Sequence, residues 1–121
     1  MKMDQEAEIR KVIELYTQGT YEGDAVKLEA SFHENAVMNG YLGGQLLMAT
    51  PAPFIAEICK APMSQTDFNY SPVVTELSIE DKVATVTLLE TYPDGMSFTN
   101  YFHLIDDGAD WKIVSKLFAS R

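Results

Sequence analysis

The second half of the chain is an almost uninterrupted series of strand-like segments separated by short turns. Its strand-forming residues either alternate with polar ones or form runs rich in Val, Thr and Leu. We expect four strands, over residues 73–79, 83–92, 97–105 and 111–118. The expected turns are Glu80-Asp81-Lys82, Pro93-Asp94-Gly95 and Asp106-Asp107-Gly108. Such short connections make neighbouring strands antiparallel, so this half should form a meandering sheet.

The first half contains the helices that such a sheet needs as a cover. Apolar residues with the spacing of one helix face predict a first helix: Ile9, Val12, Ile13 and Tyr16. Asp24 can cap a short second helix that runs to Phe32, and Thr50-Pro51 can start a third that Pro62 ends. A short strand pair, 36–41 and 45–48, lies between the second and third helices. Helices early and a meander late predict one α+β domain over residues 1–121, with helices on one face of an antiparallel sheet.

Charge and composition exclude several classes of partner. The chain has 9 basic and 18 acidic residues and a net charge of −9, which opposes binding to nucleic acid and to anionic membranes. Its single cysteine, Cys59, cannot form an intrachain disulfide. The N-terminal residues show no basic patch followed by an apolar run, and no apolar stretch approaches the roughly 20 residues of a membrane span. We therefore expect a cytoplasmic protein.

The order of elements, with three sequence segments, resembles the nuclear transport factor 2-like superfamily, over about Ile9 to Phe118. The segments are Gly23-Asp24 with Phe32-His33-Glu34-Asn35-Ala36, Gly40-Tyr41 with Gly44 and Leu46, and Phe98 to Leu104 with Trp111 to Phe118. They are most similar to the subfamily labelled putative lumazine-binding, which tends to have Asp where this chain has Asn100. The resemblance implies a cystatin-like α+β roll, in which a cone-shaped curved sheet wraps around N-terminal helices. It also implies a pocket between the helices and the concave face.

Strand alternation indicates which residues line that pocket. The resemblance favours Phe98, Asn100, Phe102 and Leu104 as the concave face of their strand. In the last strand, alternation leaves two choices open for the concave face: Lys112, Val114, Lys116 and Phe118, or Trp111, Ile113, Ser115 and Leu117. The expected ligand-binding residues are Tyr41, Phe54, Phe98, Asn100, Phe102, Lys116 and Phe118.

Two residues are candidates for catalysis, and each has a structural alternative. His33 can act as a general acid or base near neutral pH, or it can be a capping or buried hydrogen-bonding residue. The Tyr16 hydroxyl can donate to a substrate carbonyl, or Tyr16 can be a core aromatic residue whose hydroxyl contacts water. Lys116 can bind an anionic ligand or pair with a carboxylate, or its stem can simply cover apolar surface.

These residues favour a domain that binds a small apolar or aromatic ligand, without a metal or other cofactor. The alternatives are an isomerase, dehydratase or cyclase that uses Tyr16 and His33 for proton transfer, and an interaction module with a filled cone. The uncovered face of the sheet predicts a homodimer. That face should carry Tyr101 and Ile105, with either Trp111 and Ile113 or Val114 and Phe118.

The resemblance also argues against one activity known in the superfamily. Aligned with its steroid isomerases, this chain has Tyr16 in the place of an oxyanion-hole tyrosine. It has Gly40 in the place of the carboxylate base, and a glycine cannot move a proton. We therefore expect no steroid isomerisation by that mechanism.

Overall fold

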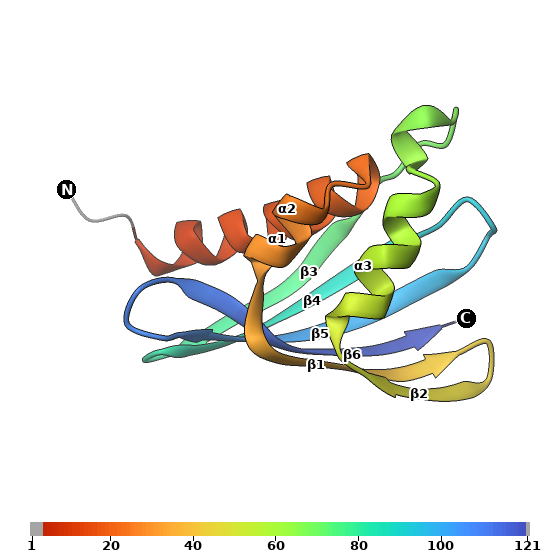
Figure 1. Ribbon diagram of the computed structural model, residues 1–121. Helices are drawn as coiled ribbons and strands as arrows, with labels where there is room; N and C mark the ends of the chain where they lie inside the picture. The colour runs from red at the N-terminus through yellow and green to blue at the C-terminus, as the bar shows by residue number, and fades with distance from the viewer. Residues whose placement is uncertain (1–3, 121) are drawn as a thin grey trace.

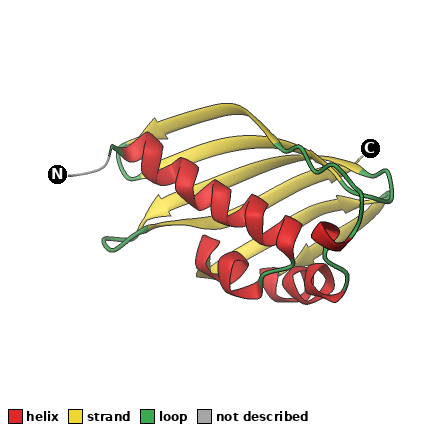
Figure 2. Ribbon diagram, turned by 90° about the horizontal axis from the view of Figure 1, so that it is seen from above, coloured by secondary structure: helices red, strands yellow, loops and turns green. Residues whose placement is uncertain are grey.

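One curved sheet of six strands carries all the helices on its concave face (Figures 1 and 2). The computed structural model describes residues 4–120. Met1 to Met3 lie outside the described residues. They belong to the N-terminal segment that shows no leader pattern in the sequence. The elements are α1 (Gln5–Glu22), α2 (Ala25–Ser31), β1 (Phe32–Leu42), β2 (Gln45–Ala49), α3 (Pro51–Lys60), a 3₁₀ turn (Met63–Gln65), β3 (Val73–Glu80), β4 (Val83–Thr91), β5 (Ser97–Asp106) and β6 (Trp111–Ser120). No helix between residues 4 and 120 is both long and apolar enough to cross a membrane.

The strands lie in the order β2-β1-β6-β5-β4-β3, which confirms the α+β class and the four-strand meander. All neighbouring pairs are antiparallel except β1 and β6, which are parallel, with Met38 opposite Lys116 and Gly40 opposite Phe118. A turn dictates the direction of strands that follow each other in the chain. β1 and β6 are far apart in sequence, so only the completed sheet decides how they pair.

The first helix contains one glycine and ends at a second one. Asp4 caps its start by accepting a hydrogen bond from the Ala7 N–H at 2.9 Å. Gly19 lies inside α1, where a Cβ atom would come within 2.8 Å of the Leu28 side chain. The helix ends at Gly23, which has φ 65°. Gly19 therefore permits the close approach of α2, and Gly23 makes the turn into it.

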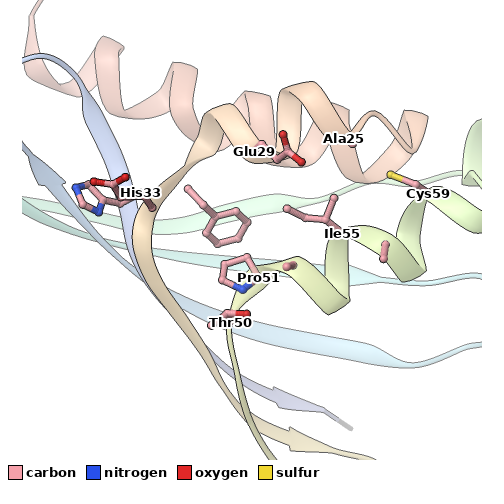
Figure 3. Close-up of a pocket in the computed structure, with 11 residues that line it drawn as sticks. Ala25, Glu29, His33, Thr50, Pro51, Ile55 and Cys59 are labelled. Carbon is pink, nitrogen blue, oxygen red and sulfur yellow. The ribbon is translucent and has the colours of Figure 1, made fainter.

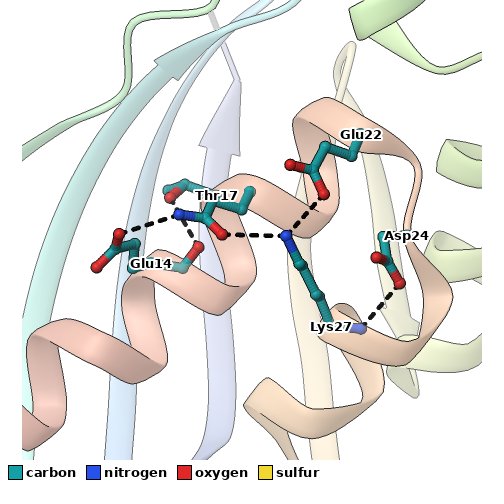
Figure 4. A network of polar contacts seen from close by, with 6 residues as sticks. Glu14, Thr17, Glu22, Asp24 and Lys27 are labelled. Atoms are coloured by element: carbon teal, nitrogen blue, oxygen red, sulfur yellow. Dashed lines mark hydrogen bonds and ion pairs between the residues drawn. The ribbon is translucent and has the colours of Figure 1, made fainter.

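Polar contacts also join α1 to α2 (Figure 4). The Lys27 ammonium donates to Glu22 at 2.8 Å and to Gln18 at 3.1 Å, and the Lys27 backbone N–H donates to the Asp24 side chain at 3.2 Å. Asp24 thus caps α2 as expected. At α3, Pro51 takes the first helical position as expected, but the Thr50 side chain makes no capping bond.

The core lies between α1 and the concave face of the sheet. Tyr16 is fully buried at its centre, with its ring 4.9 Å from that of Phe102, 6.1 Å from that of Phe54 and 6.2 Å from that of Phe32. The inward face of β5 is the one expected, because Phe98, Asn100, Phe102 and Leu104 are all buried.

A bulge in β6 changes which face of that strand is buried. His103 pairs with Ser115, but Leu104 pairs with Ile113, so Val114 is an extra residue in the ladder. Trp111 and Ile113 are buried before the bulge, and Lys116 and Phe118 are buried after it. Neither alternation considered for this strand therefore holds over its whole length, and the bulge is what directs Lys116 inward.

Candidate functional site

A glutamate, Glu90, is buried on the concave face of the sheet. It follows Ala84, Val86 and Leu88, which are the inward-facing residues of β4, and only 3% of it is exposed. A buried carboxylate is costly unless it is paired or hydrogen-bonded. The signal that could have identified Glu90 was in the sequence, since an acidic residue continues an otherwise apolar face, but our sequence analysis did not single it out.

Four donors surround the Glu90 carboxylate, one of them on helix α1 and the others in or beside the sheet. Hydroxyl groups donate from Tyr16 at 2.8 Å, from Tyr70 at 2.5 Å and from Tyr92 at 3.3 Å. The Asn100 amide nitrogen donates at 2.9 Å, and also donates to the Leu88 carbonyl. We call Tyr16, Tyr70, Glu90, Tyr92, Asn100 and Lys116 the Glu90 cluster. Among residues 4–120, no three His, Cys, Asp or Glu side chains gather as metal ligands would.

The tyrosines of the cluster act as hydrogen-bond donors to Glu90. Burial raises the pKa of the Tyr16, Tyr70 and Tyr92 hydroxyls well above the usual value, and the negative charge of Glu90 raises the pKa further. The three hydroxyls thus keep their protons at physiological pH.

Lys116 is the cationic member of the cluster, and it is only 3% exposed. Its Nζ donates to the Tyr16 hydroxyl at 2.7 Å and lies 4.2 Å from the centre of the Phe54 ring. Burial lowers the pKa of the Lys116 amine to about 8, and the attraction of Glu90 offsets only part of that effect. Tyr16 therefore connects the amine to the carboxylate, donating to Glu90 and accepting from Lys116.

Lys116 lines a cavity of about 380 Å³ between α3, β1, β2 and the ends of β4 to β6, which we call the Lys116 cavity. Its walls are mainly apolar: Met38, Leu47, Phe54, Met96, Phe98 and Phe118. Two exposed acidic residues, Glu57 and Asp94, also border it. The volume lies in the range usual for sites that bind small molecules.

The structure brings most of the expected ligand-binding residues to this region. Phe54, Phe98, Lys116 and Phe118 line the Lys116 cavity. Asn100 and Phe102 are completely buried and are not among its lining residues. Tyr41 is 55% exposed on the opposite face of the sheet, because it follows the inward-facing Gly40 and successive strand residues alternate.

His33 lies at a second depression, which we call the His33 cleft (Figure 3). This cleft has a volume of about 720 Å³ and lies between α2, β1 and α3. His33 follows the inward-facing Phe32, so its own side chain is directed away from the core. Its Nδ1 accepts from the Asn35 N–H at 3.0 Å, and its Nε2 is 3.9 Å from Asp107. Tyr16 and His33, expected as a catalytic pair, thus have different partners and lie at different sites.

Gly40 leaves no room for a side chain. A Cβ atom there would come within 2.0 Å of the Phe118 carbonyl oxygen in the neighbouring strand. A carboxylate base at this position would therefore require β1 and β6 to move apart.

The helices pack into the concave face of a six-stranded sheet and leave an apolar cavity at one end. This arrangement defines a nuclear transport factor 2-like domain. The family described as putative lumazine-binding matches residues 4–119, so the chain belongs to that family. None of the curated proteins is significantly similar to the chain in sequence.

Solved structures confirm the fold. A nuclear transport factor 2-like protein of unknown function from Silicibacter pomeroyi DSS-3 has a TM-score of 0.86 at 24% identity, over 98% of this chain and 100% of that one. One from Methylobacillus flagellatus KT has a TM-score of 0.86 at 22% identity, over 100% and 95%. One from Shewanella baltica OS155 has a TM-score of 0.85 at 18% identity, over 99% and 98%. At these identities the similarity establishes the fold alone.

Proposed function

We propose that the protein is a small-molecule-binding domain whose ligand occupies the Lys116 cavity. The observation that carries this proposal is a buried amine at an apolar cavity, held there by a hydrogen-bonded network that extends to Glu90. Burying a lysine and a glutamate costs free energy that an apolar pair would avoid. A ligand with a polar atom facing the amine gives this arrangement a use.

The surroundings of the cavity favour an uncharged, largely apolar or aromatic ligand. Glu57 and Asp94 border the cavity, and the whole chain carries a net charge of −9, so anions are repelled on approach. Aromatic rings such as Phe54 and Phe98 offer flat surfaces against which a planar ligand can stack. The family description suggests lumazine, a planar heterocycle with carbonyl groups, as a natural compound to test beside a neutral dye.

Fluorescence titration with the neutral dye N-phenylnaphthylamine tests this proposal, with lumazine as the second ligand. Ala49→Phe adds bulk to the Lys116 cavity, whereas Ala56→Phe adds the same bulk to the His33 cleft. We expect Ala49→Phe to weaken binding by about tenfold or more, and Ala56→Phe to leave it unchanged. No binding of either compound to the wild type, or equal losses in the two variants, would overturn the proposal.

The alternative of an isomerase, dehydratase or cyclase has narrower support. The contact of Tyr16 with Glu90 and Lys116 is suited to proton movement, and so favours such an enzyme. His33 does not contribute, because it lies at the other cleft. An enzyme of this kind would therefore have to use Tyr16 with Lys116 or Glu90.

We also propose a homodimer formed through the convex face of the sheet. Tyr101 and Leu117 pair across β5 and β6 there and are 47% and 48% exposed. We expected this face to carry either Trp111 with Ile113 or Val114 with Phe118. Neither pair lies there as a whole, because Trp111, Ile113 and Phe118 are buried on the concave side. The bulge at Val114 is the reason.

Sedimentation velocity tests the dimer. Tyr101→Glu should convert it to a monomer, because two-fold symmetry brings the new charge close to its copy. Val26→Glu alters an exposed apolar residue on α2, on the other face of the sheet, and should leave the dimer intact. A wild type that is monomeric at micromolar concentration would overturn this proposal.

A further inference from the structure

We propose that Lys116 is a nucleophile that captures an apolar aldehyde or ketone as an imine inside the Lys116 cavity. This inference rests on the proposed ligand site and adds the chemical class of the ligand, which is a carbonyl compound, and the bond that holds it. It depends on the position of the amine, its hydrogen bonds and the shape of the cavity.

The first support is the position of the amine. Nζ lies 4.2 Å from the ring centre of Phe54 and 5.6 Å from that of Phe118, and both rings line the cavity. Within the described part of the chain, Tyr16 is the hydrogen-bond acceptor that the structure gives this amine. The apolar walls can hold the hydrocarbon part of a carbonyl compound while its carbonyl carbon lies next to Nζ.

The second support is that no ion pair joins Nζ directly to the Glu90 carboxylate, because the Tyr16 hydroxyl lies between them. A lysine whose role was only to neutralise Glu90 would contact it directly, as buried ion pairs do when they are well formed. The indirect arrangement leaves a lone pair of the neutral amine available to the cavity.

The third support is the desolvation that comes with burial. At the pKa of about 8 that burial produces, about half of the Lys116 amine is neutral at pH 8. An ordinary lysine is well under about 1% neutral at that pH. Lysines that form Schiff bases in proteins are activated by desolvation in this way.

Tyr16 provides a path for the proton that the amine must lose. Its oxygen accepts from Nζ at 2.7 Å while its own hydroxyl donates to Glu90 at 2.8 Å. A proton can therefore leave Nζ for Tyr16 as the Tyr16 proton moves to Glu90. Tyr16 is in this sense a positioning and relay group for Lys116.

The reaction is a condensation and needs no oxidant or reductant. The Nζ lone pair attacks the carbonyl carbon, and a proton passes from the nitrogen to the former carbonyl oxygen to give a carbinolamine. The carbon then loses its hydroxyl group and the nitrogen loses its second proton, which releases one water molecule and leaves a carbon–nitrogen double bond to Lys116. Addition of water reverses both steps, so the capture is reversible.

The test is reductive trapping. The whole protein is incubated with naphthaldehyde and sodium cyanoborohydride, and the adduct is located by intact mass and by peptide mapping. We expect Lys116 to be modified about tenfold faster than any other lysine, because its amine is more often neutral and the cavity holds the aldehyde beside it. Saturating N-phenylnaphthylamine should protect Lys116.

Two variants and one parallel measurement make the result decisive. Lys116→Arg removes the nucleophile and should abolish the fast adduct. Lys112→Arg changes a lysine of the same strand, whose amine donates to the Ala30 carbonyl, and should leave the adduct unchanged. If the wild type binds N-phenylnaphthylamine but is trapped only at other lysines, the imine is overturned and the ligand site stands. If it neither binds the dye nor forms the Lys116 adduct, both are overturned.

Discussion

The His33 cleft and the Lys116 cavity are two of the depressions on the helical side of the sheet, and their polar groups are placed differently. The His33 cleft is the larger, at about 720 Å³ against about 380 Å³ for the Lys116 cavity. In the cleft, His33 accepts from the Asn35 backbone N–H and lies 3.9 Å from Asp107, and both of these side chains are partly exposed to water. Lys116 instead lies inside an apolar wall and donates to the fully buried hydroxyl of Tyr16.

This difference shows that volume alone does not identify the depression that carries the buried polar network. Surface polar groups such as His33 are stabilised by water whatever lies beside them, and their contacts contribute little. Lys116 and Glu90 are removed from water, so their cost is offset only by the partners that the fold provides. Polar groups buried at a cost in folding free energy are therefore found at the smaller cavity.

The largest expected contrast between the two regions is in stability. Glu90→Gln removes the charge that balances Lys116 and accepts from the tyrosines, so we expect a loss of about 3 kcal/mol in the free energy of unfolding. Glu34→Gln makes the same change at the exposed rim of the His33 cleft and should alter it by less than about 0.5 kcal/mol. Guanidinium unfolding measures both. Equal effects would show that the Glu90 cluster is not a buried network.

The next contrast is in the pH dependence of stability. The pKa of Lys116 is about 8 in the folded protein and about 10.5 when unfolded, so between these values the unfolded chain binds more protons. The free energy of unfolding should therefore rise from pH 8 by about 2 kcal/mol in total. Above about pH 10 it should fall, because the buried tyrosines keep protons that the unfolded chain releases.

Unfolding curves at several pH values check this profile. Lys116→Met should lose the rise while keeping the fall above about pH 10, which the tyrosines cause. A wild-type profile that is flat or falling from pH 8 to pH 10 would contradict the burial of a titrating amine at this site.

The smallest expected effect is at His33. Its contact with Asp107 is long, at 3.9 Å, and both side chains are partly exposed. His33→Gln should change the free energy of unfolding by less than about 0.5 kcal/mol and leave dye binding unchanged. A large loss of binding in this variant would move the site to the His33 cleft and reverse the comparison.

Much of the fold could be predicted from the sequence because its signals are local. Turn residues such as Pro93-Asp94-Gly95 mark the ends of strands. Alternation grouped Asn100 with Phe102 on one face of β5, and the resemblance correctly identified that face as the inner one. The resemblance likewise led to the family. Of the Glu90 cluster, Tyr16, Asn100 and Lys116 were named from the sequence as candidate site residues.

What the sequence alone determined is therefore the order of the elements, the fold class and several inward-facing residues. Only the tertiary structure decided the site itself. The bulge at Val114 turns Lys116 inward, and alternation, which assumes one residue per step, cannot place an extra one. Tyr16 and Tyr70 meet at Glu90 because the curved sheet and α1 bring distant segments together. Such convergence depends on the packing of the whole chain, and no local pattern carries it.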